Sequence, residues 1–251
     1  MILLKLLKKN MNKYKINTEK IIDNIFIVSS VIIIILLITY SIKSDNFNIH
    51  NININNNDFL SNNEIEEIIT NELEDKNIFN INISELKNSI NEHNYIRSSK
   101  IYTTYPNNIF IHINEIIPIV LFEENSQYFL IDHRTNKIKA DIKALNYYSV
   151  PIITSDIKNK NIINVITYSL INIFNNNNEL YDSISEIKIN DNEIHYTTKY
   201  RTTIKLNENN INQNTTTLIN FLNQNKVKKI ESYEYVNLLI PNQIIVKEKS
   251  I

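Results

Sequence analysis

The sequence contains neither glycine nor cysteine. Without glycine, the chain cannot form a phosphate-binding P-loop, a dinucleotide-binding fingerprint or the nucleophile elbow of an α/β-hydrolase. Without cysteine, it has no thiol nucleophile, no thiolate zinc site and no disulfide, so packing alone must stabilise any part outside the cytoplasm. These two absences exclude three large enzyme classes and every cysteine-based site.

An excess of positive charge is missing as well. The 26 basic and 27 acidic residues give a formal net charge of −1. A nucleic-acid-binding protein normally carries a basic domain or a basic stripe. We therefore expect no nucleic-acid partner.

Asparagine replaces glycine at the expected turns. It tolerates the left-handed backbone conformation better than other residues do. The Asn run at 55–57 and the pair Asp191-Asn192 therefore predict tight turns. The heavy use of Asn, Ile and Lys is also explained by a compositional bias of the genome, so a single Asn carries no functional weight.

One long apolar run is present near the N-terminus. Residues 25–42, IFIVSSVIIIILLITYSI, carry no charge, and at about 1.5 Å per residue they span most of a hydrocarbon core. A cleaved signal peptide would need a shorter apolar region and an Ala-x-Ala site, but the first alanine is Ala140. The run therefore predicts an uncleaved transmembrane helix.

The distribution of lysines predicts the direction of this helix. Lys43 follows the run, and the next basic residue is Lys76. By the positive-inside rule, the short N-terminus stays in the cytoplasm and the remainder is exported. The lysines before the run are Lys5, Lys8, Lys9, Lys13, Lys15 and Lys20.

The residues after the run predict a strand, two helices and two more strands. Phe47 and Ile49, then Ile52 and Ile54, alternate as in a half-buried strand, and Ser61 with Glu64 forms a capping box before a helix. A second short helix begins near Ser84. Strands follow at 96–104 and 109–115, joined by the turn Tyr-Pro-Asn-Asn. We expect one shared core between helix and sheet, made by Ile65, Ile69, Leu73, Ile109, Ile111 and Ile113.

This order predicts a small α+β unit with its helices on one face of a sheet, and two of its motifs resemble a known family. The run FxIxxIxIxxNxxLSxxEI at 47–65 and the run YPxxIFIHIxExxPIV at 105–120 are similar to the FtsQ/DivIB family of bacterial cell-division proteins. Asn56-Asn57 stands where the family has Gly-Asn. The family's Glu-Arg-x-Pro reads Glu115, Ile116, Ile117, Pro118 here, without the Arg.

The second half of the chain resembles the same family in the same order. FLIDHRTNKI at 129–138 and VPII at 150–153 are similar to its short strands, and EIKI and EIHYTT flank a two-residue hairpin signal. VNLLIPNQIIVK at 236–247 resembles its closing pattern, with Asn237 and Leu239 in place of an Asp and an Arg.

The resemblance implies an α+β fold with four parts. These are a cytoplasmic N-terminus at 1–24, a transmembrane helix at 25–43, a POTRA domain (β-α-α-β-β) at 46–117, and an FtsQ/DivIB-type C-terminal domain at 118–251. We expect that last domain to be mixed α/β with an extended antiparallel sheet.

The residues offer little for catalysis or metal binding. The five histidines lack the spacing that places two ligands on one helical face. The one cluster of acid, His and base, Asp132-His133-Arg134, is interpreted as a strand end and a turn. We therefore expect no enzyme activity, no catalytic residues, no metal, no cofactor and no small-molecule substrate.

A binding role has a physical basis, because a strand at the margin of a sheet can accept an extended partner. The candidate edge strand is Gln243, Ile244, Ile245 and Val246. In the FtsQ/DivIB family this region is implied to bind FtsB, with FtsL beside it, and the POTRA domain to contact other divisome components. The resemblance thus implies a scaffold of the divisome in the inner (plasma) membrane at the division site, with its C-terminus on the periplasmic side.

Two alternatives remain. A POTRA factor of outer-membrane barrel assembly would need many alternating segments of about ten residues after residue 120, where this chain is too short and too helical. A membrane-anchored envelope enzyme would act through Asp132 or His133.

Overall fold

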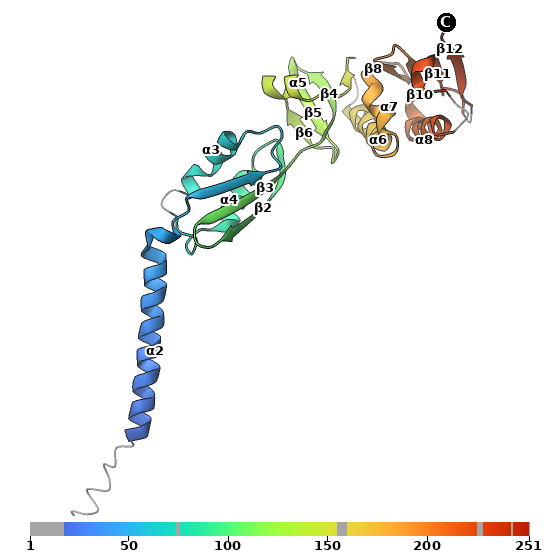
Figure 1. Cartoon of the computed structure of the whole chain (residues 1–251). Helices are drawn as coiled ribbons and strands as arrows, with labels where there is room; N and C mark the ends of the chain where they lie inside the picture. Colours follow the sequence, from blue (N-terminus) through green and yellow to red (C-terminus); the bar gives the residue numbers. More distant parts are fainter. Residues whose placement is uncertain (1–17, 74–75, 155–159, 225–227, 242, 251) are drawn as a thin grey trace, which may run out of the picture. The chain divides into compact units, whose positions relative to one another are not determined.

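The computed structural model describes residues 18–73, 76–154, 160–224, 228–241 and 243–250 (Figure 1). The chain divides into two compact units. The first contains residues 1–55, 62–90 and 99–113, and the second contains 56–61, 91–98 and 114–251. The borders expected from the sequence, at 46–117 and 118–251, stay a prediction.

The first element is a long apolar helix, α2 (Thr18–Lys43). Its stretch Ile21–Lys43 is long and apolar enough to cross a membrane. Hydroxyl groups inside an apolar span need acceptors. Ser29, Ser30, Thr39 and Ser41 each donate to a carbonyl of their own helix at 2.8–2.9 Å. The carbonyl groups of α2 therefore accept the hydrogen bonds of these four hydroxyl groups. The lysines at 5–15 lie outside the described residues, and the direction of the helix stays a prediction.

The expected order of strand, helix, helix, strand, strand is confirmed. The sheet order is β1-β3-β2, and β1 runs parallel to β3 with Ile52 opposite Ile109 and Ile54 opposite Ile111. The elements are β1 (Asn51–Asn55), α3 (Asn62–Leu73), α4 (Ile83–Asn91), β2 (Ile96–Thr104) and β3 (Asn108–Glu115).

The chain between α2 and β1 differs from the expected alternating strand. Residues Asp45–Phe47 form a short 3-10 helix, η2, and the strand begins only at Asn51. The backbone here pairs with a loop instead of the sheet. Ile49 N–H donates to Lys76 O at 3.1 Å, and Ile78 N–H donates to Phe47 O at 3.0 Å.

The predicted core between helix and sheet is confirmed except at one residue. Ile65 and Ile69 of α3 and Ile109, Ile111 and Ile113 of β3 are fully buried. Leu73 is only half-buried, because α3 ends there and its last turn extends beyond the covered face.

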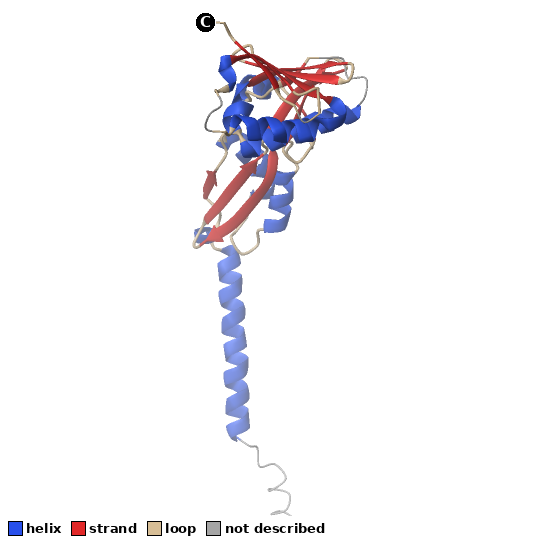
Figure 2. Ribbon diagram, turned by 90° about the vertical axis from the view of Figure 1, so that its right-hand side faces the viewer, coloured by secondary structure: helices blue, strands red, loops and turns tan. Residues whose placement is uncertain are grey.

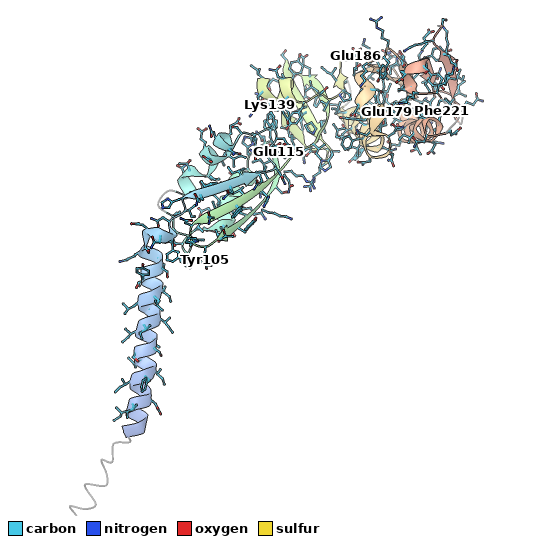
Figure 3. All side chains as sticks on the ribbon, viewed as in Figure 1. Tyr105, Glu115, Lys139, Glu179, Glu186 and Phe221 are labelled. Carbon is cyan, nitrogen blue, oxygen red and sulfur yellow. The ribbon has the colours of Figure 1, made fainter. Side chains whose placement is uncertain are left out.

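A carboxylate organises the turn before α3. Glu115 accepts the N–H groups of Phe59 and Leu60 at 2.9 and 2.8 Å, one on each oxygen (Figure 3 labels Glu115). The Arg that the FtsQ/DivIB family carries next to this Glu is replaced by Ile116, which is buried. With no Arg beside it, the Glu115 carboxylate is bound by the backbone N–H groups of the turn before α3.

The second unit is built on a nine-stranded sheet with the order β12-β11-β10-β9-β8-β7-β4-β5-β6. Most neighbours are antiparallel, as expected, but β4·β7, β7·β8 and β10·β11 are parallel. The strands are β4 (Pro118–Glu124), β5 (Gln127–Asp132), β6 (Lys137–Lys139), β7 (Ile152–Ile153), β8 (Ile184–Asn190), β9 (Glu193–Thr198), β10 (Thr203–Asn207), β11 (Tyr233–Asn237) and β12 (Ile245–Glu248).

Helices between the strands make the parallel pairs possible. A parallel pair needs a crossover connection, usually a helix. α6 (Lys160–Asn176) and α7 (Asn178–Ser183) connect β7 to β8, while η3 (Glu208–Asn210), α8 (Ile211–Leu222) and η4 (Ile230–Ser232) connect β10 to β11. α5 (Ile142–Tyr147) lies in the connection from β4 to β7, after β5 and β6.

The core of this unit lies between the sheet and the two long helices, α6 and α8, which Figure 2 shows beside the red strands. A polar chain crosses it. The Tyr196 hydroxyl of β9 donates to Ser169 Oγ of α6 at 2.9 Å, and Ser169 Oγ lies 2.7 Å from Thr215 Oγ1 of α8. Burial raises the pKa of Tyr196 above its usual value. One strand and two helices are thus joined inside the core.

Candidate binding edge at β12

The strand β12 lies at one margin of the nine-stranded sheet, where its one neighbour among the described residues is β11. The two strands are antiparallel, with Asn237 opposite Ile245 and Tyr235 opposite Lys247. All four residues of β12 are exposed. The strand near the C-terminus is therefore an edge strand of this sheet, and partner binding at it stays a prediction.

The strand begins two residues later than the sequence suggested. Gln243 lies in a turn, with its N–H donating to Ile240 O at 3.2 Å. Ile244 precedes the strand and packs against the core. Ile245 and Val246 do lie in β12, with 40% and 38% of their surfaces exposed. The sequence predicted the strand from its apolar residues. Ile244 is apolar, but its side chain packs against the core and the residue precedes the strand.

The direction of the backbone groups in β12 follows from one hydrogen bond. Lys249 N–H donates to Ser232 O at 3.0 Å, on the β11 side. Successive N–H groups of a strand point to alternate edges. The N–H groups of Lys247 and Ile245 therefore point toward β11, and those of Val246 and Glu248 point away from the sheet.

The hydrogen bonds of β11 indicate the same directions for the N–H groups of β12. Leu238 N–H donates to Lys205 O of β10 at 2.9 Å. By alternation, the N–H of Asn237 points to the other side, toward β12, where its opposite residue is Ile245. Because a hydrogen-bonded antiparallel pair exchanges both of its bonds, the free edge of β12 presents both the N–H and the C=O of Val246 and Glu248.

The charges beside this edge are paired within the domain. Lys247 Nζ lies 2.7 Å from Glu234 Oε2, and Lys228 Nζ lies 2.6 Å from Glu248 Oε2. The hydrogen bond to Glu234 raises the pKa of Lys247. Exposed pairs of this kind contribute little stability, but they place an opposite charge next to both charged residues of β12.

The opposite margin of the sheet is less suited to an added strand. β6 has three residues, and two of them are lysines. Lys137 Nζ pairs with Glu124 and lies 3.9 Å from the centroid of the Phe129 ring. Lysines on a short edge strand discourage pairing with another chain. Of the two margins, β12 is the better acceptor.

The Asp132-His133-Arg134 cluster has a structural role, as the sequence suggested. Asp132 is buried, and its Oδ1 accepts the N–H groups of Arg134 and Asn136 at 2.9 and 2.8 Å. Its Oδ2 accepts from Asn136 Nδ2 at 2.9 Å. His133 Nε2 lies 3.4 Å from Arg97 Nη1. The carboxylate of Asp132 is thus occupied in closing the turn after β5.

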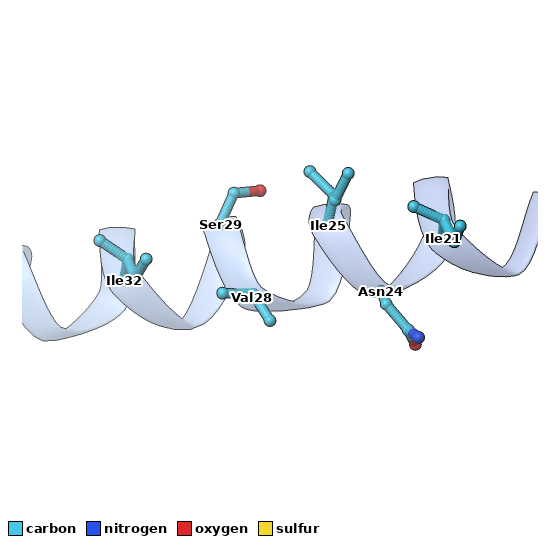
Figure 4. Close-up of a pocket in the computed structure, with 6 residues that line it drawn as sticks. All are labelled: Ile21, Asn24, Ile25, Val28, Ser29 and Ile32. Atoms are coloured by element: carbon cyan, nitrogen blue, oxygen red, sulfur yellow. The ribbon is translucent and has the colours of Figure 1, made fainter. Parts of the chain in front are cut away.

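The described part of the chain holds no group of three or more His, Asp or Glu side chains that could bind a metal. A hollow lies along α2, lined by Asn24, Ser29 and four apolar residues (Figure 4). It lies on the apolar stretch Ile21–Lys43, and none of its lining residues is titratable.

The comparisons with known proteins define the class of the chain. Residues 47–115 match the family model described as "POTRA domain, FtsQ-type". The match shows that the chain contains a POTRA domain, which follows an apolar helix that fits a transmembrane anchor.

Particular relatives are division proteins. The chain is 30% identical over 106 residues to "Cell division protein DivIB" of Clostridium tetani, which covers 41% of this chain and 39% of DivIB. It is 30% and 29% identical over 70 residues to "Cell division protein FtsQ" of Rickettsia prowazekii and Rickettsia typhi, which covers 28% of this chain and 26% of each FtsQ. The matched segments thus span well under half of these relatives. The chain contains an FtsQ-type POTRA domain and is homologous to the DivIB and FtsQ cell division proteins.

A solved structure also resembles the chain. It is the major extracytoplasmic domain of the trans isomer of DivIB from Geobacillus stearothermophilus, with a TM-score of 0.34 and 12% identity. The match covers 46% of this chain and 99% of that one.

Sequence reasoning missed Glu248, whose backbone faces outward in the same way as that of Val246. The signal that finds it is the register between β11 and β12 together with the Lys249 hydrogen bond. Neither can be read from an apolar pattern.

Proposed function

We propose that the protein is a non-enzymatic, membrane-anchored scaffold of the division machinery, and that β12 is the strand on which it receives a partner. The observation that carries this proposal is the free edge of β12, where the N–H and C=O groups of Val246 and Glu248 point away from β11. Homology to DivIB and FtsQ supports the setting in cell division.

An extended segment of the partner pairs with this edge as a tenth strand. Main-chain hydrogen bonds supply much of the affinity in this mode, and side chains on alternate positions supply the specificity. Ile245 and Val246 offer exposed apolar surface for the side chains of the added strand. The partner is an FtsB-like protein, with an FtsL-like protein beside it, and the POTRA domain contacts other divisome components.

The scaffold stands in the inner (plasma) membrane at the septum, with β12 on the periplasmic side. The lysines before the apolar run, set against the single Lys43 directly after it, support this direction. Imaging a fluorescent fusion in dividing cells tests the location. A uniform signal around the cell, with no band at the septum, would contradict the division role.

Two neighbouring proline substitutions test the edge. Proline removes one N–H. Val246→Pro removes an outward donor, so it should abolish capture of the partner and leave the fold nearly unchanged. Lys247→Pro removes a donor that bonds to β11, so it should also lower the unfolding temperature. Both full-length variants are compared by circular dichroism and by co-purification with an FtsB-like coiled-coil protein.

The comparison between the two variants decides the outcome. Capture at the wild-type level by a folded Val246→Pro variant would exclude β12 as the docking edge, and the POTRA domain would become the better candidate surface. Val246→Ala is the matched control, because it keeps the N–H and should lose less binding than proline does.

A further inference from the structure

Three aromatic rings gather at the C-terminal end of α2, where the helix meets the three-stranded part of the first unit. The rings of Phe47 and Phe79 lie 5.1 Å apart, and those of Phe79 and Tyr105 lie 5.5 Å apart. Phe79 is 45% exposed and Tyr105 is 71% exposed. Exposed aromatic rings this close to one another indicate a contact surface.

Hydrogen bonds fix this cluster to the end of the apolar helix. Asn77 is buried, and its Nδ2 donates to Ser41 O at 3.0 Å and to Ser44 O at 3.4 Å. Its Oδ1 accepts the N–H of Phe79 at 2.9 Å. One side chain thus satisfies carbonyls at the C-terminal end of α2 and holds the backbone of Phe79 beside them.

These hydrogen bonds hold the rings next to the end of the apolar stretch of α2. The apolar stretch of α2 ends at Lys43, and Asn77 bonds to residues on both sides of it. Tyr105 lies in the turn between β2 and β3, and Figure 3 labels it at the end of this unit that adjoins α2. The ring contact with Phe79 brings that turn to the same level.

We propose that Phe79 and Tyr105 lie in the headgroup region of the membrane leaflet at the C-terminal end of α2. Aromatic rings with one polar end are enriched at this depth, because the ring leaves water while the hydroxyl stays hydrated. Tyr105 has this character, and Phe79 supplies an apolar ring next to it. The partner of the cluster is a lipid surface, since the cluster is bonded to a segment that itself enters the membrane.

This contact gives the first unit a second attachment to the membrane. Because Asn77 bonds the unit to the end of α2, a helix alone would let the two rotate together relative to the plane of the membrane. The two rings, which lie on separate loops, restrict that rotation. The unit therefore has a preferred orientation at the membrane surface, independent of any protein partner.

The absence of tryptophan from the chain allows a direct test. Tyr105→Trp in the full-length protein places one indole at the proposed depth. In vesicles of phosphatidylcholine and phosphatidylglycerol, lipids brominated near the headgroup end of the acyl chains should quench its emission more than lipids brominated near the chain ends. Quenching by acrylamide from the water, with none from either brominated lipid, would overturn the proposal.

Tyr102→Trp is the matched control. Tyr102 is also exposed, at 46%, and lies on β2 three residues before Tyr105, about 10 Å further along the strand. Its indole should be quenched much less. Equal quenching at both positions would also overturn the proposal, because the contact would then not be at the turn.

A second measurement leaves the native rings in place. The chain has no cysteine, so Thr104→Cys gives one site for a spin label beside Tyr105. The label should be shielded from a water-soluble relaxation agent, and replacing both rings, by Phe79→Asn and Tyr105→Asn, should raise its accessibility several-fold. An unchanged accessibility in a folded double variant would mean that the rings do not contact lipid.

Discussion

Left-handed backbone conformations are adopted here without glycine. Asn56 has a φ of 63°, in the turn after β1, and Asp191 has a φ of 49° in the two-residue hairpin loop. The expectation that Asn would serve at such turns holds for Asn56, and the expected Asp-Asn hairpin forms. Other positive φ values occur at Asn125, Ser126, Thr135 and Arg201. Asn is therefore one solution among several, and each of the others must be stabilised by its surroundings.

The first prediction concerns the turn at Asn56. Asn56→Val should destabilise the protein by about 1–2 kcal/mol, because a side chain with a branched Cβ is crowded in the left-handed region. Asn56→Gly is the matched control and should be close to neutral. Thermal unfolding of a soluble 45–251 fragment measures both. Equal unfolding temperatures for the Val and Gly variants would show that the turn rearranges without strain.

The second prediction concerns the core between α3 and the sheet. Ile69 is fully buried, so Ile69→Ala should cost about 2–5 kcal/mol through lost transfer energy and a residual cavity. Ile68, one residue earlier on the same helix, is only half-buried. Ile68→Ala should cost clearly less. Denaturant unfolding of the same fragment separates the two, and a reversed order would mean that the helix packs with a different face.

Element by element, the parts that a local pattern determines were predictable. The strand predicted at 96–104 has these bounds in the structure, and the turn that includes Pro106 marks its C-terminal end. The hairpin at Asp191-Asn192 was found because a two-residue loop fixes the register of its strands.

The parts that depend on distant contacts were not predictable. The parallel pairs β7·β8 and β10·β11 arise because crossovers that contain α6 and α8 return the chain to the same side of the sheet, which no local pattern records. The shift of β12 has the same origin, since Ile244 is apolar for the core and not for the strand. At the candidate site, the sequence could suggest an edge strand but not the side to which each N–H points.

The third prediction concerns the polar chain that joins β9 to α6 and α8. Burial raises the pKa of Tyr196. The ionised form is thus favoured in the unfolded state, and the stability due to this group is fully present below the unfolded pKa of about 10. It is lost as the pH rises through that value toward the folded pKa, by up to about 1.4 kcal/mol per pH unit.

Tyr196→Phe tests this dependence. The variant loses the hydrogen bond to Ser169, which should cost about 0.5–1.5 kcal/mol at neutral pH. Above pH 10 its stability should fall less steeply than that of the wild type. Urea unfolding at several pH values measures both effects. Parallel curves for the two proteins would show that another group governs the alkaline loss of stability.

At the scale of the whole molecule, the fourth prediction concerns the direction of the chain through the membrane. Protease added to spheroplasts should digest the part after residue 44 and leave the N-terminal part intact, because the lysines before the span stay in the cytoplasm. An epitope tag at each end reports the two parts. Digestion of the N-terminal tag alone, with the C-terminal tag protected, would reverse the topology.

The connection between β10 and β11 determines whether β12 becomes the edge of the nine-stranded sheet. β12 pairs only with β11, and β11 joins the sheet in parallel with β10 after the crossover that contains α8. Contacts between distant parts of a chain form slowly, since the intervening loop must close first. The edge of the nine-stranded sheet therefore depends on this closure, so a chain in which β11 has not joined β10 cannot present β12 at the margin of the sheet. If a partner docks on β12 as proposed, it would thereby distinguish chains with a closed crossover from chains without one.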